Sequence, residues 1–178
     1  MSSPSSRDFV FRTEAFRQIK AVAMDVDGVL TDGTFCWGPD GTELKRFCFA
    51  DSTGITLARE AGLFIALVSG ESSPDGMALV KRYAEKLKIT DVSAGCHDKA
   101  AAVRDFAASY GINLAEVCFI GDDVIDLEAM SMVGLAVAPA DAHASVRDSA
   151  AYVTGAAGGR GAVREVLDII LTEHDRIG

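Results

Sequence analysis

Three aspartates stand at the end of one apolar run in the stretch AVAMDVDGVLTDG, which covers residues 21–33. They are Asp25, Asp27 and Asp32, and the run before them has the composition of a buried strand. Carboxylates gathered at a buried strand end raise one another's energy unless a cation binds there. Because Asp25 and Asp27 are two positions apart, both side chains leave a strand on the same side and can face one pocket. This stretch therefore predicts a cation-dependent chemical site.

A second acidic cluster lies in FIGDDVIDLEAM, where Asp122 and Asp123 follow another apolar run and Asp126 comes one helical turn later. If Asp122 lies near Asp25, the two carboxylates need a hard cation, and magnesium prefers such oxygen ligands while keeping several waters. Helix capping also explains Asp122 and Asp123 when this cluster is taken alone, because aspartate is common at helix starts. Two acidic clusters at two strand ends favour the metal site.

Two further residues have the chemistry to bind an anion. In LVSGESS, the Ser69 hydroxyl and the backbone N–H groups that follow a strand can form an anion cradle. Lys99 stands at the head of a predicted helix in GCHDKAAAVRDF. A lysine in such a place is ordinarily solvated. Both residues become informative only if the strands bring them to the acidic clusters.

The elements that must position these residues alternate along the chain. Short apolar runs rich in β-branched residues predict strands, and the segments between them have helical spacing. The predicted strands are Ile19–Val26, Leu63–Val68, Val117–Ile120 and Leu135–Val137, with weaker candidates at Thr90–Val92 and Tyr152–Val153. The predicted helices include 76–87 and 161–174. Strands that are apolar on both faces predict an α/β fold with a doubly wound, Rossmann-like parallel sheet sandwiched by helices, whose ligand site lies beyond the carboxyl ends of the strands.

The segment GTFCWGPDGTELKRFCFAD breaks this alternation. Its Gly-Pro-Asp-Gly turn between two extended runs predicts a β-hairpin flap at about 33–49. The flap carries more aromatic surface than an exposed ribbon should show, from Phe35, Trp37, Phe47 and Phe49. Packing against the rest of the chain and contact with another subunit both explain these aromatics.

Composition limits the class of protein and its partners. The 178 residues suffice for one ordinary domain, predicted over 14–178 after a flexible, serine-rich segment at 1–13. The formal net charge of −9 argues against nucleic acid and against an anionic membrane surface as partners. The four cysteines lack metal-site or C-x-x-C spacing and are expected to be small buried hydrophobes, and no apolar run is long enough to cross a bilayer. We therefore expect a cytoplasmic protein.

Taken in order, DVDGVLTDG, the Ser-Gly pair, the isolated lysine and GDD-x-x-D resemble the four motifs of phosphatases in the haloacid dehalogenase superfamily. The resemblance extends from about Ile19 to Leu171. A hairpin in place of a cap domain is similar to the small capless branch, and the segment from VGLAVAPADAH to VREVLDIIL is similar to the 3-deoxy-D-manno-octulosonate 8-phosphate phosphatases. The resemblance implies a phosphomonoesterase with no cap domain, whose site is closed by self-association, usually in a homotetramer.

The resemblance also implies a role for each motif residue. Asp25 is the expected nucleophile, which forms an aspartyl-phosphate, and Asp27 is the expected general acid and base. Magnesium is expected to bind the Asp25 carboxylate, the Asp27 backbone carbonyl and Asp122. Lys99 is the expected catalytic cation, which holds phosphoryl oxygens and offsets their charge. The remaining implied assignments are phosphate binding by Ser69 and Gly70, outer contacts to waters and Lys99 by Asp123 and Asp126, and binding of a sugar-acid carboxylate by Arg160. Asp32 also matches the opening motif, and we assign it to loop shaping. A flexible hinge before the last helix explains the GGRG segment around Arg160 equally well.

Two departures from the octulosonate phosphatases concern the substrate. Those proteins usually have Arg-Asp-Gly before the first helix, where this chain has Ala50-Asp51-Ser52-Thr53-Gly54, and Gly-Arg after the second motif, where it has Gly70-Glu71. At both places the chain is more similar to the nonulosonate 9-phosphate phosphatases, which pair such a glutamate with a later lysine at the position of Lys86. Solvated surface charge explains Glu71 and Lys86 equally well.

The sequence thus predicts a magnesium-dependent phosphatase of a 2-keto-3-deoxy sugar acid phosphate. The first candidate substrate is 3-deoxy-D-manno-octulosonate 8-phosphate, and the second is a nonulosonate 9-phosphate such as that of KDN or N-acetylneuraminate. Two alternatives come from other classes, a phosphoaspartate signalling receiver and a non-catalytic assembly domain of the same fold. A receiver uses a lone aspartate on a middle strand, whereas D-x-D here ends the first long strand. An inactive domain would not need the full set of Asp25, Asp27, Ser69, Lys99 and Asp122.

Overall fold

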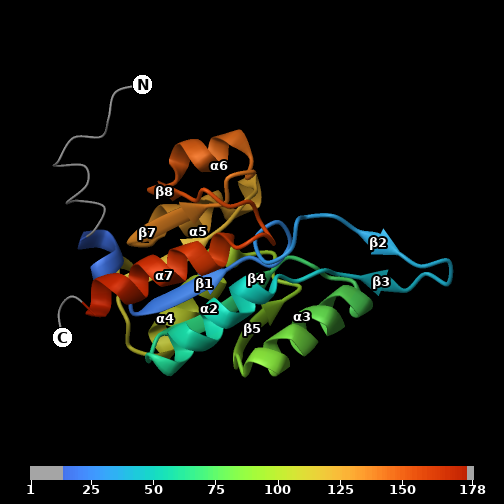
Figure 1. The fold of residues 1–178 in the computed structure, drawn as a ribbon, viewed down its shortest axis with the longest axis horizontal. Coiled ribbons are helices and arrows are strands. Elements are labelled where there is room, and N and C mark those ends of the chain that lie inside the picture. Colours follow the sequence, from blue (N-terminus) through green and yellow to red (C-terminus); the bar gives the residue numbers. More distant parts are fainter. Residues whose placement is uncertain (1–13, 176–178) are drawn as a thin grey trace.

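A six-stranded parallel sheet forms the centre of residues 14–175, the part of the chain that the computed structural model describes (Figure 1). The strand order is β5-β4-β1-β6-β7-β8, and every neighbouring pair is parallel. The strands are β1 Ala21–Met24, β4 Phe64–Ser69, β5 Asp91–Ala94, β6 Val117–Ile120, β7 Leu135–Ala138 and β8 Tyr152–Val153. These bounds confirm the predicted α/β fold. The predicted flexible segment at 1–13 lies outside the described residues.

Helices cover both faces of this sheet. The helices α2, α3 and α7 share one apolar cluster with the strands, and α4, α5 and α6 share the other. Their bounds are α2 Phe49–Glu60, α3 Pro74–Leu87, α4 Lys99–Ser109, α5 Leu127–Met132, α6 Ala144–Ser149 and α7 Ala162–Asp175, with 3₁₀ turns η1 Leu114–Glu116 and η2 Val124–Asp126. Within residues 14–175, no helix combines the length and the apolar character needed to cross a membrane.

The two faces of the sheet differ in side-chain size. On β1, Val22 and Met24 pack into the cluster of α2, α3 and α7, whereas Ala21 and Ala23 face the cluster of α4 and α5. All four side chains are buried, as expected for a strand covered on both sides. The second face is dominated by small side chains from several strands, namely Ala21, Ala23, Ala66, Ala136 and Ala138. Helices α4 and α5 can therefore pack close to the sheet backbone.

The order of the strands determines where a site can form. The chain runs from β1 to β4 and β5 on one side, and then returns to β6 on the other side of β1. Connections that leave in opposite directions open a crevice at the carboxyl ends of β1 and β6. Asp25 directly follows β1 and Asp122 comes two residues after β6, so the two acidic motifs meet at this crevice.

The predicted hairpin is present and projects from one end of the sheet (Figure 1). Its strands β2 Cys36–Trp37 and β3 Glu43–Leu44 pair antiparallel and have only two residues each. Gly41 completes the turn with φ +83°, a conformation that favours glycine. The expectation that the cysteines are buried is wrong for Cys36, which is exposed, and confirmed for Cys118 in β6, whereas Cys48 and Cys96 are only half-buried.

The hairpin aromatics differ in whether they pack against their own chain or remain available for contact with another subunit. Phe47 stacks on Tyr83 of α3 with ring centroids 3.9 Å apart, so this side chain packs against its own chain. The side chains of Phe35, Trp37 and Phe49 are 65%, 69% and 80% exposed. Packing within one chain therefore accounts for Phe47 and leaves the exposed Phe35 and Trp37 of the hairpin and Phe49 at the start of α2 to be explained.

Candidate active site

Asp25 is held at the end of β1 by one backbone contact and one buried cation. Its Oδ1 accepts the N–H of Val26 at 2.7 Å, and its Oδ2 lies 2.7 Å from Nζ of Lys99. Both side chains are almost completely buried. Burial raises the pKa of Asp25 to about 7, although the Lys99 charge lowers it. The Lys99 side chain is not the solvated lysine that its sequence context suggests, but the partner of a buried carboxylate.

Asp126 fixes Lys99 from the other side. Its Oδ1 lies 2.7 Å from Lys99 Nζ, and its Oδ2 accepts the N–H groups of Asp122 and Asp123 at 3.0 and 3.2 Å. Burial lowers the pKa of Lys99, but the charges of Asp25 and Asp126 outweigh burial and raise it. Both carboxylate oxygens of Asp126 are thus engaged, which suits a residue that orients Lys99.

Asp122 and Asp123 are adjacent, but their carboxylates differ in their hydrogen bonding. Oδ1 of Asp123 accepts the N–H of Val124 at 2.7 Å and caps η2, so the capping interpretation is right for Asp123. The Asp122 Oδ1 atom is buried and has no hydrogen-bond partner among residues 14–175. Burial, with the charges of Asp25 and Asp126 added, raises the pKa of Asp122 to about 8. A buried carboxylate oxygen without a partner is an atom that a cation would satisfy.

The acidic side chains fit a divalent metal ion. Asp25, Asp122 and Asp126 each offer an oxygen, and these three oxygens lie within 4.8 Å of one another. Because Asp126 is already engaged, the two available carboxylates are those of Asp25 and Asp122. The backbone of Gly28 lies against Asp122, since a Cβ at this position would lie 2.0 Å from its Oδ2 atom. Oxygen donors with room for water suit magnesium.

Ser69 and Gly70 lie at the carboxyl end of β4, the strand beside β1. The Ser69 side chain is fully buried, and its Oγ accepts the N–H of Glu71 at 3.2 Å. A Cβ on Gly70 would lie 3.7 Å from the Cys96 carbonyl oxygen, which is an ordinary contact. The structure thus brings Ser69 to the same sheet edge as Asp25.

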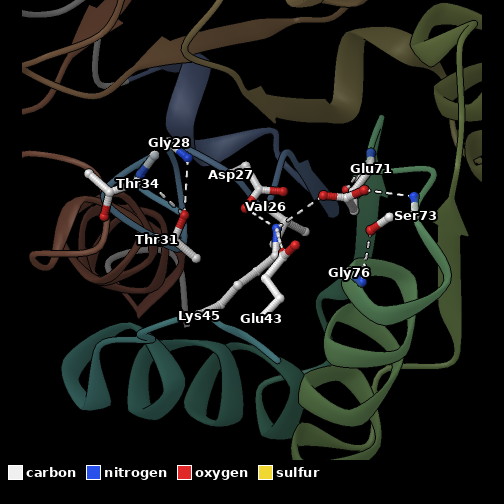
Figure 2. A network of polar contacts seen from close by, with 12 residues as sticks. Val26, Asp27, Gly28, Thr31, Thr34, Glu43, Lys45, Glu71, Ser73 and Gly76 are labelled. Carbon is white, nitrogen blue, oxygen red and sulfur yellow. Dashed lines mark hydrogen bonds and ion pairs between the residues drawn. The ribbon is translucent and has the colours of Figure 1, made fainter. Parts of the chain in front are cut away.

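Asp27 faces a lysine that the sequence analysis missed (Figure 2). Its half-exposed carboxylate accepts a hydrogen bond from Lys45 Nζ at 2.5 Å. Only 2% of the Lys45 side chain is exposed, although this residue follows β3 in the projecting hairpin. Its Nζ also lies 3.6 Å from Glu71 and 3.7 Å from Glu43. No spacing in the sequence marks Lys45, because its position depends on how the hairpin folds back over the first motif.

Glu71 does not meet Lys86 within one chain. Glu71 accepts the N–H of Ser73 at 2.7 Å and pairs with Lys45, and these interactions outweigh partial burial and lower its pKa. Lys86 lies near the far end of α3, and its Nζ is 5.1 Å from the ring centroid of Phe49. Twelve helical steps from Pro74 to Lys86 span about 18 Å. The expected pair could therefore form only with Lys86 of another copy.

The GGRG segment lies against the first motif of its own chain. The N–H of Gly159 donates to the Val29 carbonyl at 2.9 Å, and a Cβ on Gly158 would lie 1.9 Å from the Gly28 carbonyl oxygen. This segment is therefore packed rather than a free hinge. Arg160 is 59% exposed, with its guanidinium 3.8 Å from Asp32. It points a cation toward the rim of the site.

Asp32 and Asp51 organise the loops around the site. Asp32 accepts hydrogen bonds from Thr34 and Arg46, which hold its pKa below the ordinary value, in keeping with a loop-shaping role. Asp51 of α2 is fully buried and accepts the N–H groups of Gly161 and Arg164 at 3.2 and 2.8 Å. No motif in the sequence marks Asp51, yet it anchors the end of the GGRG segment and the start of α7.

Comparisons with known proteins give a consistent result. The family model described as haloacid dehalogenase-like hydrolase matches residues 62–167. The chain is 38% identical over 174 residues to 3-deoxy-D-manno-octulosonate 8-phosphate phosphatase KdsC of Escherichia coli K12, covering 98% of this chain and 89% of that protein. A crystal structure of the Yersinia pestis phosphatase has a TM-score of 0.88 at 38% identity, covering 94% of this chain and 88% of that one. The Moraxella catarrhalis phosphatase, solved with magnesium, phosphate and KDO, has a TM-score of 0.86 at 34% identity, covering 93% and 95%.

Proposed function

The chain belongs to the haloacid dehalogenase-like hydrolase family, and from this premise we propose that it is a magnesium-dependent phosphatase of 3-deoxy-D-manno-octulosonate 8-phosphate. The observation that carries the proposal is the buried pair of Asp25 and Lys99, which lies close to the unpartnered Oδ1 atom of Asp122. A nucleophile, a cation and a metal ligand then share one crevice. Phosphate monoesters are among the slowest bonds to hydrolyse unaided, so such a combination matches the chemical demand.

The first chemical step transfers the phosphoryl group to Asp25. Its carboxylate oxygen attacks phosphorus, and the bond from phosphorus to the sugar oxygen breaks, giving an aspartyl-phosphate. Asp27 gives its proton to the leaving oxygen. Lys99 stays beside the Asp25 carboxylate and offsets the negative charge on the phosphoryl oxygens, which Ser69 helps to orient.

The second step returns the enzyme to its starting state. Asp27, now ionised, takes a proton from water as the water oxygen attacks phosphorus, and the bond to Asp25 breaks to release phosphate. The metal would be held by the carboxylates of Asp25 and Asp122 and by the backbone carbonyl of Asp27. When bound, magnesium neutralises the charge on these oxygens and on the phosphate. Asp126 keeps Lys99 in place, and Asp123 keeps the η2 turn capped.

The sugar acid is read at the rim of the site. Arg160 supports a substrate with a carboxylate, because its exposed guanidinium lies beside the first motif. Glu71 favours a second candidate, a nonulosonate 9-phosphate, because Glu71 and Asp27 both contact Nζ of Lys45. Glu71 therefore lies beside the catalytic residues. Lys86 can contribute to binding of this substrate only if it comes from a second copy of the chain.

The experiment compares kcat/KM with magnesium on the octulosonate 8-phosphate and on a nonulosonate 9-phosphate. Preference for the first supports the proposed substrate, and preference for the second makes Glu71 a substrate-reading residue. Stable labelling by acetyl phosphate without turnover would identify a phosphoaspartate receiver. Failure to release phosphate from any ester would leave a non-catalytic assembly domain.

We propose that the chain self-associates, as the homotetramer that the family resemblance implies; the exposed Phe35 and Trp37 of the hairpin and Phe49 at the start of α2 support an interface between copies. Sedimentation analysis gives the mass of the assembly and tests this part directly. Residues 14–178 are proposed to form one domain, so a single cooperative melting transition is expected. A cytoplasmic location is part of the same proposal, and cell fractionation tests it.

A further inference from the structure

Lys45 is an unusual residue for a projecting hairpin. Its neighbours Leu44 and Arg46 are exposed, whereas only 2% of the Lys45 side chain is accessible. Lysine is rarely buried in proteins, and a buried lysine is ordinarily paired with a carboxylate. Figure 2 shows the side chain extending from the hairpin toward the first motif, with its Nζ between carboxylates from three separate segments. The hairpin therefore delivers a buried cation to the catalytic crevice.

The three carboxylates around Lys45 are not equivalent. Asp27 lies 2.5 Å from Nζ and forms the hydrogen bond, whereas Glu71 and Glu43 lie 3.6 and 3.7 Å away. Oε1 of Glu43 is buried and has no hydrogen-bond partner among residues 14–175. The other oxygen of Glu43 accepts the indole N–H of Trp37 at 3.3 Å. Glu43 and Glu71 thus confine the ammonium group, and Asp27 receives its hydrogen bond.

The half-exposed Asp27 side chain needs this contact to be placed accurately. Within the described part of the chain, Lys45 is the hydrogen-bond partner of the Asp27 carboxylate. A short carboxylate on a loop samples several rotamers when nothing holds it. Proton transfer requires the acid within hydrogen-bond reach of the leaving oxygen. A misplacement of about 1 Å is enough to cost a large part of the rate.

We propose that Lys45 is a positioning residue for the reaction, which holds the Asp27 carboxylate where it can give its proton to the leaving oxygen. This inference rests on the proposed function, because it assumes that Asp27 acts as the general acid. In the step itself, the proton moves from Asp27 to the oxygen that leaves phosphorus, and Lys45 keeps all its protons. The hairpin is then part of the catalytic apparatus as well as a surface.

The test compares two leaving groups with the Lys45→Met variant. A sugar-acid phosphate has a poor leaving oxygen that needs a proton, whereas p-nitrophenyl phosphate has an activated one that does not. The quantity measured is kcat/KM, which reports the steps up to departure of the leaving group. We expect Lys45→Met to lower kcat/KM about 10²-fold on the sugar-acid phosphate and less than about threefold on p-nitrophenyl phosphate. Lys81→Met, which removes an exposed cation of α3, is the matched control and should change neither value by more than about twofold.

A double-mutant cycle tests whether Lys45 acts through Asp27. Adding Lys45→Met to Asp27→Asn should lower kcat/KM on the sugar-acid phosphate by less than about threefold further, because the group to be positioned is already gone. Multiplying losses, equal losses on both substrates, or no loss at all would overturn the inference and leave Lys45 a structural residue. Should Lys45→Met melt below the assay temperature, both substrates are assayed below its Tm, and the same comparison of losses decides the role of Lys45.

Failure of the proposed function has a separate signature. Wild-type protein that hydrolyses p-nitrophenyl phosphate but neither sugar-acid phosphate refutes the proposed substrate. The leaving-group comparison is then made with glycerol 3-phosphate as the unactivated ester, and the same ratio decides the role of Lys45. Wild-type protein that hydrolyses no phosphate ester refutes both the function and the inference.

Discussion

Replacing Asp122 by asparagine should stabilise the metal-free protein while abolishing its response to magnesium. The pKa of Asp122 is raised to about 8, chiefly by burial, from an ordinary value of 3.8. Ionisation of Asp122 is therefore less favourable in the folded state than in the unfolded state, and this difference lowers the free energy of unfolding. At ~1.4 kcal/mol per pKa unit this is at most about 6 kcal/mol. Because the residue is partly open to solvent, which screens the charge, we expect about 2–3 kcal/mol.

The sign of the pH dependence follows from the same shift. Below pH 3.8 Asp122 is protonated in both states, so Asp122→Asn should have little effect through charge. Between about pH 4 and 8 the unfolded state loses its proton first, and the wild-type free energy of unfolding falls as pH rises. The gain from Asp122→Asn should therefore grow over this range and level off above about pH 8.

Differential scanning calorimetry in EDTA measures this gain as a change in Tm. For a chain of this size, 2–3 kcal/mol corresponds to roughly 5–10 °C. Magnesium at about a hundred times its Kd should stabilise the wild type by about 2.7 kcal/mol and the variant by much less. Asp123→Asn is the matched control, since it removes the adjacent charge while its side-chain oxygen can still accept the N–H of Val124, and it should change the free energy of unfolding by less than about 0.5 kcal/mol. A lower metal-free Tm for Asp122→Asn at pH 8, or an undiminished response to magnesium, would refute this reasoning.

Three further predictions concern activity and assembly. Asp25→Asn should lower phosphate release by more than about 10³-fold without lowering the metal-free Tm, because it removes a buried carboxylate of raised pKa; turnover near the wild-type rate would exclude Asp25 as nucleophile. Glu71→Arg should shift the ratio of kcat/KM values toward the octulosonate 8-phosphate about tenfold, and an unchanged ratio would remove Glu71 from substrate reading. Trp37→Glu should shift the sedimentation profile to smaller species, because the exposed aromatic surface then carries a charge; an unchanged profile would place the interface elsewhere.

Much of the fold is predictable because buried parallel strands are apolar on both faces. The runs at Val117–Ile120 and Tyr152–Val153 match β6 and β8 at both ends. The meeting of Asp25 and Asp122 also follows from a general rule, since parallel strands direct their carboxyl ends to one edge. The rule needs no knowledge of side-chain packing.

The remaining features depend on packing that no local pattern encodes. Lys99 is an ordinary lysine by context, and its burial arises only when Asp25 and Asp126 close around it. Lys45 depends on the angle at which the hairpin folds back. The expected contact of Glu71 with Lys86 ignored the length of α3, which separates them within one chain. Sequence spacing predicts which residues share an edge, but long-range folding of irregular segments decides which of them touch.

The two-residue strands of the hairpin have a consequence for heat tolerance. A ribbon this short has little stability of its own and is held by its contacts with the rest of the protein. Segments of this kind open at lower temperature than the sheet that supports them. Since the hairpin delivers Lys45 to Asp27, opening of the ribbon removes that contact while the core is intact. Turnover should therefore fail on warming several degrees before the protein melts, so that the working temperature of the enzyme is set by its least regular segment.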